Sequence, residues 1–193
     1  MARAPSRWRH RDERRARHRR CDARRDSARG VYGQRLALIQ PTRAEIDALS
    51  QAYIAAMATD CQETIAAFRQ AGVAIALVSG GIRQALQPLS RQLGVYAADL
   101  HAVDVEFDAA GNYRAFDSSS PLTTSAGKGV VVATLALPRP ALAVGDGHTD
   151  LAMRPVVDSF AAFTGFIARS AVVQNADCEV KSFQDLATVV LGG

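Results

Sequence analysis

Apolar residues along this chain fall into two kinds of segment, helical stripes and short unbroken runs, which alternate from about residue 31 onward. Stripes with spacings of three and four residues predict helices that bury one face. Thr42 and Glu45 fit a capping box, which marks the start of one such helix. The expected helices lie at about residues 31–39, 42–58, 62–70, 82–93 and 128–137.

Unbroken apolar runs predict strands that are buried on both faces, as in parallel sheets. Residues 73–78 and 141–144 are such runs, and shorter strands are expected at 157–163 and 176–180. Residues 99–116 alternate around an Asp-Ala-Ala-Gly-Asn turn, which predicts a hairpin. Because strands and helices alternate, the predicted class is α/β, with a doubly wound parallel sheet.

Residues 1–29 differ sharply from the rest of the chain. They contain no Val, Leu, Ile or Phe and carry 12 arginines and four acidic residues, a net charge of +8, whereas the remaining residues have a net charge of −4. This composition favours a disordered tail. Out-of-frame translation of a GC-rich gene, or a mis-called start, would produce the same composition, and the other reading frames of the upstream DNA would test that hypothesis. Binding of nucleic acid through the arginines is an alternative, and it would be sequence-independent and sensitive to salt.

The body of the chain has the composition of a globular protein, with 48% hydrophobic residues overall. No apolar run approaches the roughly 18 to 20 residues that cross a bilayer, so no membrane partner is expected. Cys21, Cys61 and Cys178 are far apart, which argues against a disulfide framework and against a zinc ribbon. A cytoplasmic location is the simplest interpretation of this cysteine usage.

Polar residues follow two of the apolar runs. Ser79, Gly80 and Gly81 follow the first, and a hydroxyl beside glycine N–H groups suits a phosphate. Asp146 and Asp150 follow the second, and two carboxylates at a strand end suit Mg²⁺. The alternative at the first place is an ordinary strand-to-helix turn, and at the second it is an ordinary turn with an aspartate that caps the helix.

Lys128 precedes the second run and is one of only two lysines in the chain, so it is a candidate for neutralising a phosphoryl group. Together, these elements resemble the ordered motifs of haloacid dehalogenase phosphatases, and within them the phosphoserine phosphatase family. The segments that carry the resemblance are QRLALIQPTR (34–43), LVSGGIR (77–83), FDSSSPLTTSAGKG (116–129) and VGDGHTDLAM (144–153).

The resemblance implies hydrolysis of O-phosphoserine to serine and phosphate, a step of serine biosynthesis, through an aspartyl-phosphate intermediate with Mg²⁺. It also implies a role for each matching residue. Ser79, Gly80 and Gly81 would bind the phosphoryl group, and Lys128 would balance its charge. Asp146 would ligate Mg²⁺, and Asp150 would orient Lys128 or the metal shell. Arg35 would pair with the substrate carboxylate, and Thr149 and Arg169 would lie near the site, although Arg169 is equally a candidate surface residue.

One expected element is missing from this chain. The family carries its nucleophile in an Asp-x-Asp-x-Thr string after a central first strand, and the residues before Val31 contain neither the string nor an apolar strand. The resemblance therefore implies a tail at 1–29, a remnant of a helical cap at 30–58, and a core at 59–193 without its first strand. Its absence would leave unpaired edges on the strands that end at Ser79 and Gly145. An inactive or impaired phosphatase is expected, and a pseudoenzyme that binds phosphate or phosphoserine without turnover is the alternative.

Overall fold

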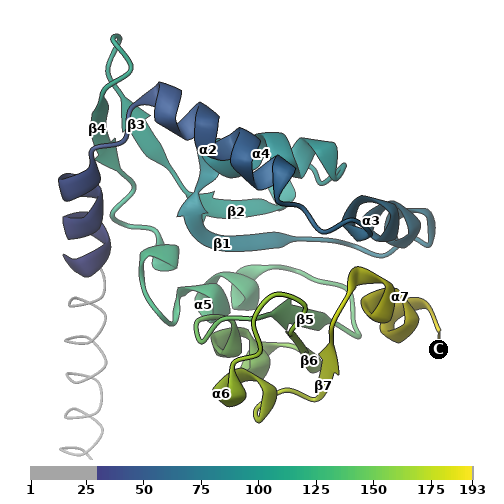
Figure 1. Cartoon of the computed structure of the whole chain (residues 1–193). Coiled ribbons are helices and arrows are strands. Elements are labelled where there is room, and N and C mark those ends of the chain that lie inside the picture. The colour runs from purple at the N-terminus through teal and green to yellow at the C-terminus, as the bar shows by residue number, and fades with distance from the viewer. Residues whose placement is uncertain (1–29, 193) are drawn as a thin grey trace, which may run out of the picture.

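The computed structural model describes residues 30–192, which form a mixed α/β fold (Figure 1). Residues 30–39 are helical. The other α-helices are α2 (Arg43–Ala55), α3 (Cys61–Gln70), α4 (Arg83–Gln92), α5 (Gly127–Thr134), α6 (Ser170–Val173) and α7 (Phe183–Leu191). The strands are β1 (Leu77–Ile82), β2 (Leu100–Val103), β3 (Val105–Phe107), β4 (Tyr113–Phe116), β5 (Leu142–Gly145), β6 (Ser159–Phe163) and β7 (Cys178–Val180). Short 3₁₀ helices are η1 (Ala97–Asp99), η2 (Pro121–Thr123) and η3 (Asp150–Val156). The predicted tail at residues 1–29 lies outside the described residues.

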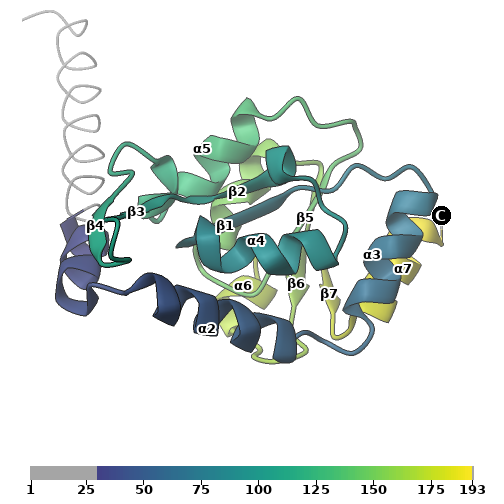
Figure 2. The same cartoon turned by 90° about the horizontal axis from the view of Figure 1, so that it is seen from above.

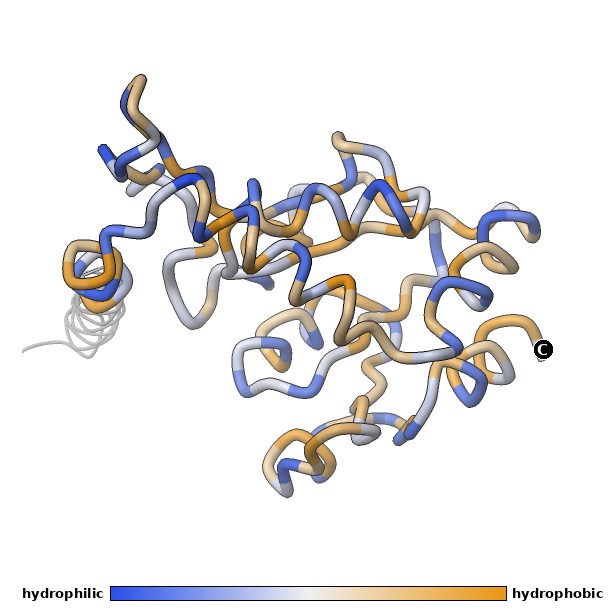
Figure 3. Tube along the Cα trace, turned by 45° about the horizontal axis from the view of Figure 1, so that its top comes forward, coloured by the Kyte–Doolittle hydropathy of each residue, from blue (hydrophilic) through white to orange (hydrophobic). Residues whose placement is uncertain are grey.

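Local sequence signals set several helix ends as predicted. The capping box of α2 is confirmed, because the Thr42 hydroxyl accepts a hydrogen bond from the Glu45 N–H and the Glu45 carboxylate accepts one from the Thr42 N–H at 2.7 Å. Gly72 follows α3 with a φ of 76°, a conformation that glycine adopts without strain. Hydropathy alternates along the helices in Figure 3, as expected where one face is buried.

The strands form two parallel sheets and one antiparallel hairpin. β1 pairs with β2, and β5, β6 and β7 pair in that order. The hairpin of β3 and β4 projects from the sheets and contacts the helix at residues 30–39, where the Tyr32 and Phe116 ring centroids lie 5.5 Å apart (Figure 1). Helix α2 runs beside α4, and α3 lies beside α7 (Figure 2).

Two hydrophobic clusters cover opposite faces of the parallel strands. The first cluster joins α3, α7 and the segment after α4, and its buried members are Cys61, Ile65, Phe68, Leu93, Val95 and Leu186. The second cluster joins α5, β5, η3, β6 and α6, and its buried members are Val132, Ala143, Met153, Phe160, Ala162 and Val172. The strands are therefore covered by helices on both sides, which accounts for the unbroken apolar runs in the sequence.

Several expected boundaries were wrong. The helix expected at 42–58 ends at Ala55. The strand expected at 73–78 begins at Leu77 and continues through Ile82, because its ladder with β2 starts at Leu77. The hairpin expected at 99–116 begins only at Val105, since Leu100–Val103 pairs with β1 in parallel. The helix expected at 128–137 ends at Thr134.

Within residues 30–192, no strand connects the two parallel sheets. β1 pairs only with β2, and β5 pairs only with β6. The division of the chain into tail, cap remnant and core remains a prediction. Over the same residues, no helix has the length and apolar character needed to cross a membrane.

Candidate functional site

The pair of Lys128 and Asp150 is the most enclosed charged contact among the described residues. Lys128, in the first turn of α5, donates to one carboxylate oxygen of Asp150, which begins η3. The other oxygen accepts the Gly147 N–H at 2.7 Å. The side chains are 18% and 7% exposed, respectively. A nearly buried carboxylate is thus held by one cation and one backbone donor, which fixes the ammonium group beyond the end of β5.

Two glycines allow the backbone to come this close. A Cβ at Gly145, the last residue of β5, would lie 2.4 Å from the Cβ of Asp150. A Cβ at Gly127, the residue before the lysine, would lie 1.9 Å from the Pro121 carbonyl oxygen. Neither neighbour is the end of a flexible side chain, so a larger residue would displace the backbone on which the Lys128 pair depends.

Asp146 and Arg169 form a second, more exposed pair at the same strand end. The Arg169 guanidinium contacts the Asp146 carboxylate and also donates to the Asp146 carbonyl at 2.9 Å. The two side chains are about half exposed. Arg169 is exposed, as its alternative assignment to the surface expects, and the 23 residues between it and Asp146 leave no local signal for the contact.

Ser79, Gly80 and Gly81 lie inside β1 rather than after it. The Ser79 hydroxyl accepts the Gly81 N–H at 3.0 Å, so the predicted hydroxyl and N–H groups face one another. A Cβ at Gly80 would lie 3.2 Å from the Leu122 carbonyl oxygen in η2, next to Pro121, which Gly127 contacts. The end of β1 and the start of α5 therefore meet across η2, which brings this segment into the neighbourhood of Lys128. No hydrogen bond in the described part of the chain joins the Ser79 and Lys128 side chains.

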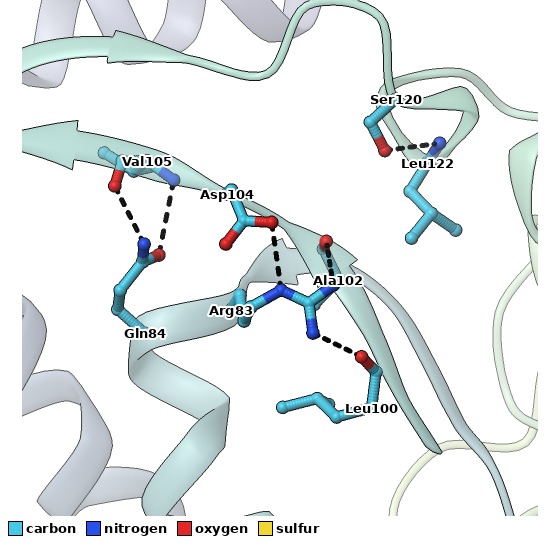
Figure 4. Close-up of polar contacts among 8 residues, drawn as sticks. All are labelled: Arg83, Gln84, Leu100, Ala102, Asp104, Val105, Ser120 and Leu122. Carbon is cyan, nitrogen blue, oxygen red and sulfur yellow. Dashed lines mark hydrogen bonds and ion pairs between the residues drawn. The ribbon is translucent and has the colours of Figure 1, made fainter. Parts of the chain in front are cut away.

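Arg83, directly after β1, is a site-adjacent residue that sequence reasoning missed. It donates through Nε to the Asp104 carboxylate at 3.0 Å and through its terminal nitrogens to the carbonyls of Leu100 and Ala102 (Figure 4). Burial lowers the pKa of His101 below its ordinary value, and the positive charge of Arg83 lowers it further. The negative charge of Asp99 raises this pKa and so opposes the shift. The arginine within LVSGGIR was the available signal, and its role here is to anchor β2.

A cavity of about 230 Å³ adjoins this arginine. Its polar lining includes Arg83, His101, Asp117 and Ser120. Asp117 already accepts the N–H and hydroxyl of Ser119, which lower the pKa of its carboxyl group. The Arg83 guanidinium and the Asp117 carboxylate at its wall therefore already have hydrogen-bond partners.

Two predicted site residues are not joined to the others. Arg35 is exposed on the helix at residues 30–39, which packs through Leu36 and Tyr32 rather than through the arginine. Thr149 is exposed at the start of η3, and no hydrogen bond of its side chain is found among the described residues. The structure gives neither of them a contact with Ser79, Lys128 or the aspartates.

The described residues do not form a complete magnesium site. No cluster of three or more His, Cys, Asp or Glu side chains occurs within residues 30–192. The carboxylates of Asp146 and Asp150 are each already paired with a cation, Arg169 and Lys128. Mg²⁺ prefers several oxygen ligands in near-octahedral geometry, and the described residues do not supply such a set, so the role of Asp146 as a ligand remains a prediction.

Comparison with known proteins places this arrangement in a family. The family model described as haloacid dehalogenase-like hydrolase matches residues 2–155. Phosphoserine phosphatase of Bos taurus is 31% identical over 156 residues, which cover 79% of this chain and 69% of the relative. Phosphoserine phosphatase of Homo sapiens is 30% identical over the same length and the same shares.

A solved structure has the same fold. It is a phosphoserine phosphohydrolase-like protein from Francisella tularensis, which matches with a TM-score of 0.74 and 23% sequence identity. The match covers 86% of this chain and 80% of the other. The mixed α/β arrangement with parallel strands is therefore that of the phosphoserine phosphatase fold.

Proposed function

We propose that this chain binds the phosphoryl group of phosphoserine but hydrolyses phosphoserine far more slowly than its complete relatives do. The chain belongs to the haloacid dehalogenase-like hydrolase family and is phosphoserine phosphatase-like. The groups proposed to bind phosphate are the Ser79 hydroxyl, the N–H groups of Gly80 and Gly81, and the Lys128 ammonium. They follow the family resemblance residue by residue.

One observation carries the slow turnover. Asp150 is held through both carboxylate oxygens, by Lys128 and by the Gly147 N–H, and one oxygen of Asp146 is paired with Arg169. The family resemblance assigns the attacking carboxylate to neither of them but to an Asp-x-Asp-x-Thr string. The sequence before Val31 offers no such string. Loss of a central member of a catalytic unit lowers rates by on the order of 10⁴ to 10⁶.

Mg²⁺ is proposed as the metal of the completed site, with Asp146 as one ligand. Its chemistry there would be to orient the phosphoryl oxygens and offset their charge. We assign no step to it in this chain, because the described carboxylates leave its shell unfilled. Arg35 and Thr149 are kept as substrate-binding proposals only, since they rest on the sequence match.

The test separates binding from turnover. Phosphoserine binding is measured by calorimetry, and phosphate release is measured beside human phosphoserine phosphatase with Mg²⁺ present. We expect saturable phosphoserine binding that Lys128→Met abolishes and Lys181→Met, at the exposed second lysine, leaves unchanged. Turnover comparable to the human enzyme would refute the slow-hydrolysis proposal, and binding that ignores Lys128→Met would refute the proposed phosphate site.

The alternative is a pseudoenzyme with no turnover at all. Single-turnover measurements with an excess of protein over phosphoserine distinguish it, because a slow enzyme releases phosphate stoichiometrically with time and a pseudoenzyme releases none. Nucleic-acid binding through residues 1–29 receives no support from the described residues.

A further inference from the structure

The ladder between β1 and β2 is interrupted at the segment for which the sequence predicts phosphate binding. Val78 pairs with His101, and the next pair is Ile82 with Val103. Residues 79–81 of β1 therefore lie opposite a single residue of β2, so β1 carries a bulge with two extra residues. We call residues 79–81 the bulge segment. Within the described part of the chain, none of its residues has a partner in the ladder.

A regular ladder would give β1 a different register. Counted on from the last pair before the bulge, Gly80 would lie opposite Val103. Ile82 would lie opposite Val105, two residues further along than its observed partner. A shift of two residues leaves every side chain on its own face of the sheet, so burial does not exclude this register. In it, main-chain hydrogen bonds to β2 would take up the backbone of the bulge segment.

Arg83, the first residue of α4, fixes the observed register from outside the ladder. Its Nε donates to the Asp104 carboxylate at 3.0 Å (Figure 4). Its terminal nitrogens donate to the carbonyls of Leu100 and Ala102. The Asp104 side chain is about half exposed, so this ion pair acts on geometry more than on stability. Because the guanidinium is planar and its donors have fixed directions, the three contacts hold the chain after the bulge at one position along β2.

Gln84, the next residue, occupies backbone groups at the position that Ile82 would face in the regular register. Its side-chain amide donates to the Val105 carbonyl at 2.8 Å, and its side-chain oxygen accepts the Val105 N–H at 3.3 Å (Figure 4). A side-chain amide that donates to and accepts from one residue takes the place of a neighbouring strand. Both backbone groups of Val105 are therefore unavailable to β1. We call Arg83 and Gln84 the clamp.

We propose that Arg83 and Gln84 are positioning residues for the phosphate site, and this inference rests on the function proposed above for the bulge segment. The clamp holds β1 in the register that contains the bulge. It thereby keeps the Ser79 hydroxyl and the N–H groups of Gly80 and Gly81 out of the regular ladder and directed toward a phosphoryl group. Bulges beside binding sites re-aim chain groups in this way. The clamp acts through the backbone of β1 and needs no contact of its own with phosphate.

The test compares two clamp variants with matched controls in the full chain. Arg83→Lys keeps the charge but lacks the planar fork, and Gln84→Met keeps the side-chain length without an amide donor or oxygen acceptor. The controls are Arg91→Lys and Gln87→Met, on the same helix. No hydrogen bond of these two control side chains is found among the described residues.

The first readout needs no phosphoserine. Nuclear Overhauser contacts between backbone protons report which residue of β1 lies opposite Val103, and amide chemical shifts report the surroundings of Gly80 and Gly81. We expect contact of Ile82 with Val103 in the parent and in both controls. In each clamp variant, we expect the two glycine amides to shift and a contact of Gly80 with Val103 to appear.

The second readout is phosphoserine binding, measured by calorimetry at urea-free conditions where unfolding curves show each variant to be folded. We expect the affinity of both clamp variants to fall by about tenfold or more, the effect of one misaligned hydrogen bond to a charged group. Both controls should bind phosphoserine as the parent does. If Arg83→Lys fails to fold, Gln84→Met still decides.

Unchanged amides of Gly80 and Gly81 in the clamp variants would overturn the proposal, and so would equal changes in the controls. Altered amides with unchanged phosphoserine affinity would also overturn it, since the register would then not matter to binding. If the parent binds no phosphoserine, the proposed function fails and the positioning role fails with it. The register readout then shows separately whether the clamp fixes the bulge.

Discussion

Replacing Lys128 with methionine tests the pair on which the candidate site is built. The substitution keeps most of the side-chain volume and removes the charge, so Asp150 is left with the Gly147 N–H as its remaining described donor. Its side chain is 7% exposed, and water therefore cannot readily replace the lost ammonium. The free energy of unfolding should fall for this reason rather than through loss of packing.

The expected loss follows from the geometry of the pair. Breaking a fully buried ion pair by removal of one partner costs about 3–5 kcal/mol. Lys128 is 18% exposed and Asp150 keeps one hydrogen bond at 2.7 Å, so we expect about 2–4 kcal/mol. For a chain of this size that corresponds to a fall in Tm of roughly 5–15 °C.

The assay is urea unfolding at neutral pH of Lys128→Met, Asp150→Asn and the double variant. Asparagine can still accept the Gly147 N–H, and the double variant leaves no buried charge unpaired. The two losses should therefore be non-additive, with a coupling energy of about 1–3 kcal/mol. Lys181→Met, at an exposed lysine, should stay within about 0.5 kcal/mol of the parent. A parent-like Lys128→Met, or strictly additive losses, would refute the reasoning.

Three other measurements probe different parts of the structure. Gly127→Ala should lower the free energy of unfolding by about 1–3 kcal/mol, because its Cβ would overlap the Pro121 carbonyl, whereas Gly30→Ala, with open space around it, should be neutral or better. Because the pKa of His101 is lowered below 6.5 in the folded state, the unfolded state binds more protons as the pH falls through that value, and the stability of the fold falls with the pH. His101→Gln should flatten this dependence of stability on pH between about pH 5 and 7. The control variant, His148→Gln at an exposed histidine, should not flatten it. Calorimetry should find weak Mg²⁺ binding, and tight binding abolished by Asp146→Ala would contradict the incomplete site.

Local sequence signals predicted the elements, and long-range contacts set the boundaries that were missed. The Thr42 and Glu45 capping box acts over three residues, and it can therefore be recognised in the sequence. The point where β2 ends and the hairpin begins cannot be recognised in the sequence. Asp104 and the β2 carbonyls are held there by Arg83, about twenty residues earlier. An alternating pattern alone does not distinguish a parallel strand from the first strand of a hairpin.

In the candidate site, too, local sequence signals identified residues, whereas long-range contacts could not be predicted. Lys128 and Asp150 were both predicted as site residues, and the structure brings them into contact across 22 residues of sequence. Arg169 was assigned near the site only with an alternative, and its contact with Asp146 depends on a loop conformation that no motif records. Arg35 was assigned by resemblance alone, and the helix that carries it packs on Phe116 of the hairpin through other side chains.

Electrostatics and sheet architecture are connected at this site. Lys128 and Arg169 each hold an aspartate, so the four formal charges cancel within the described residues. A phosphate monoester, with close to two negative charges at neutral pH, would then compete with Asp150 for the Lys128 ammonium group of the proposed site. The neutral donors that could favour phosphate are on β1, at Ser79 to Gly81, and the cations lie beyond β5. β1 and β5 share side-chain clusters but no hydrogen bonds, so the spacing between donors and cations depends on what pairs with their free edges. Pairing of those edges and the proposed recognition of phosphate therefore depend on the same two strands.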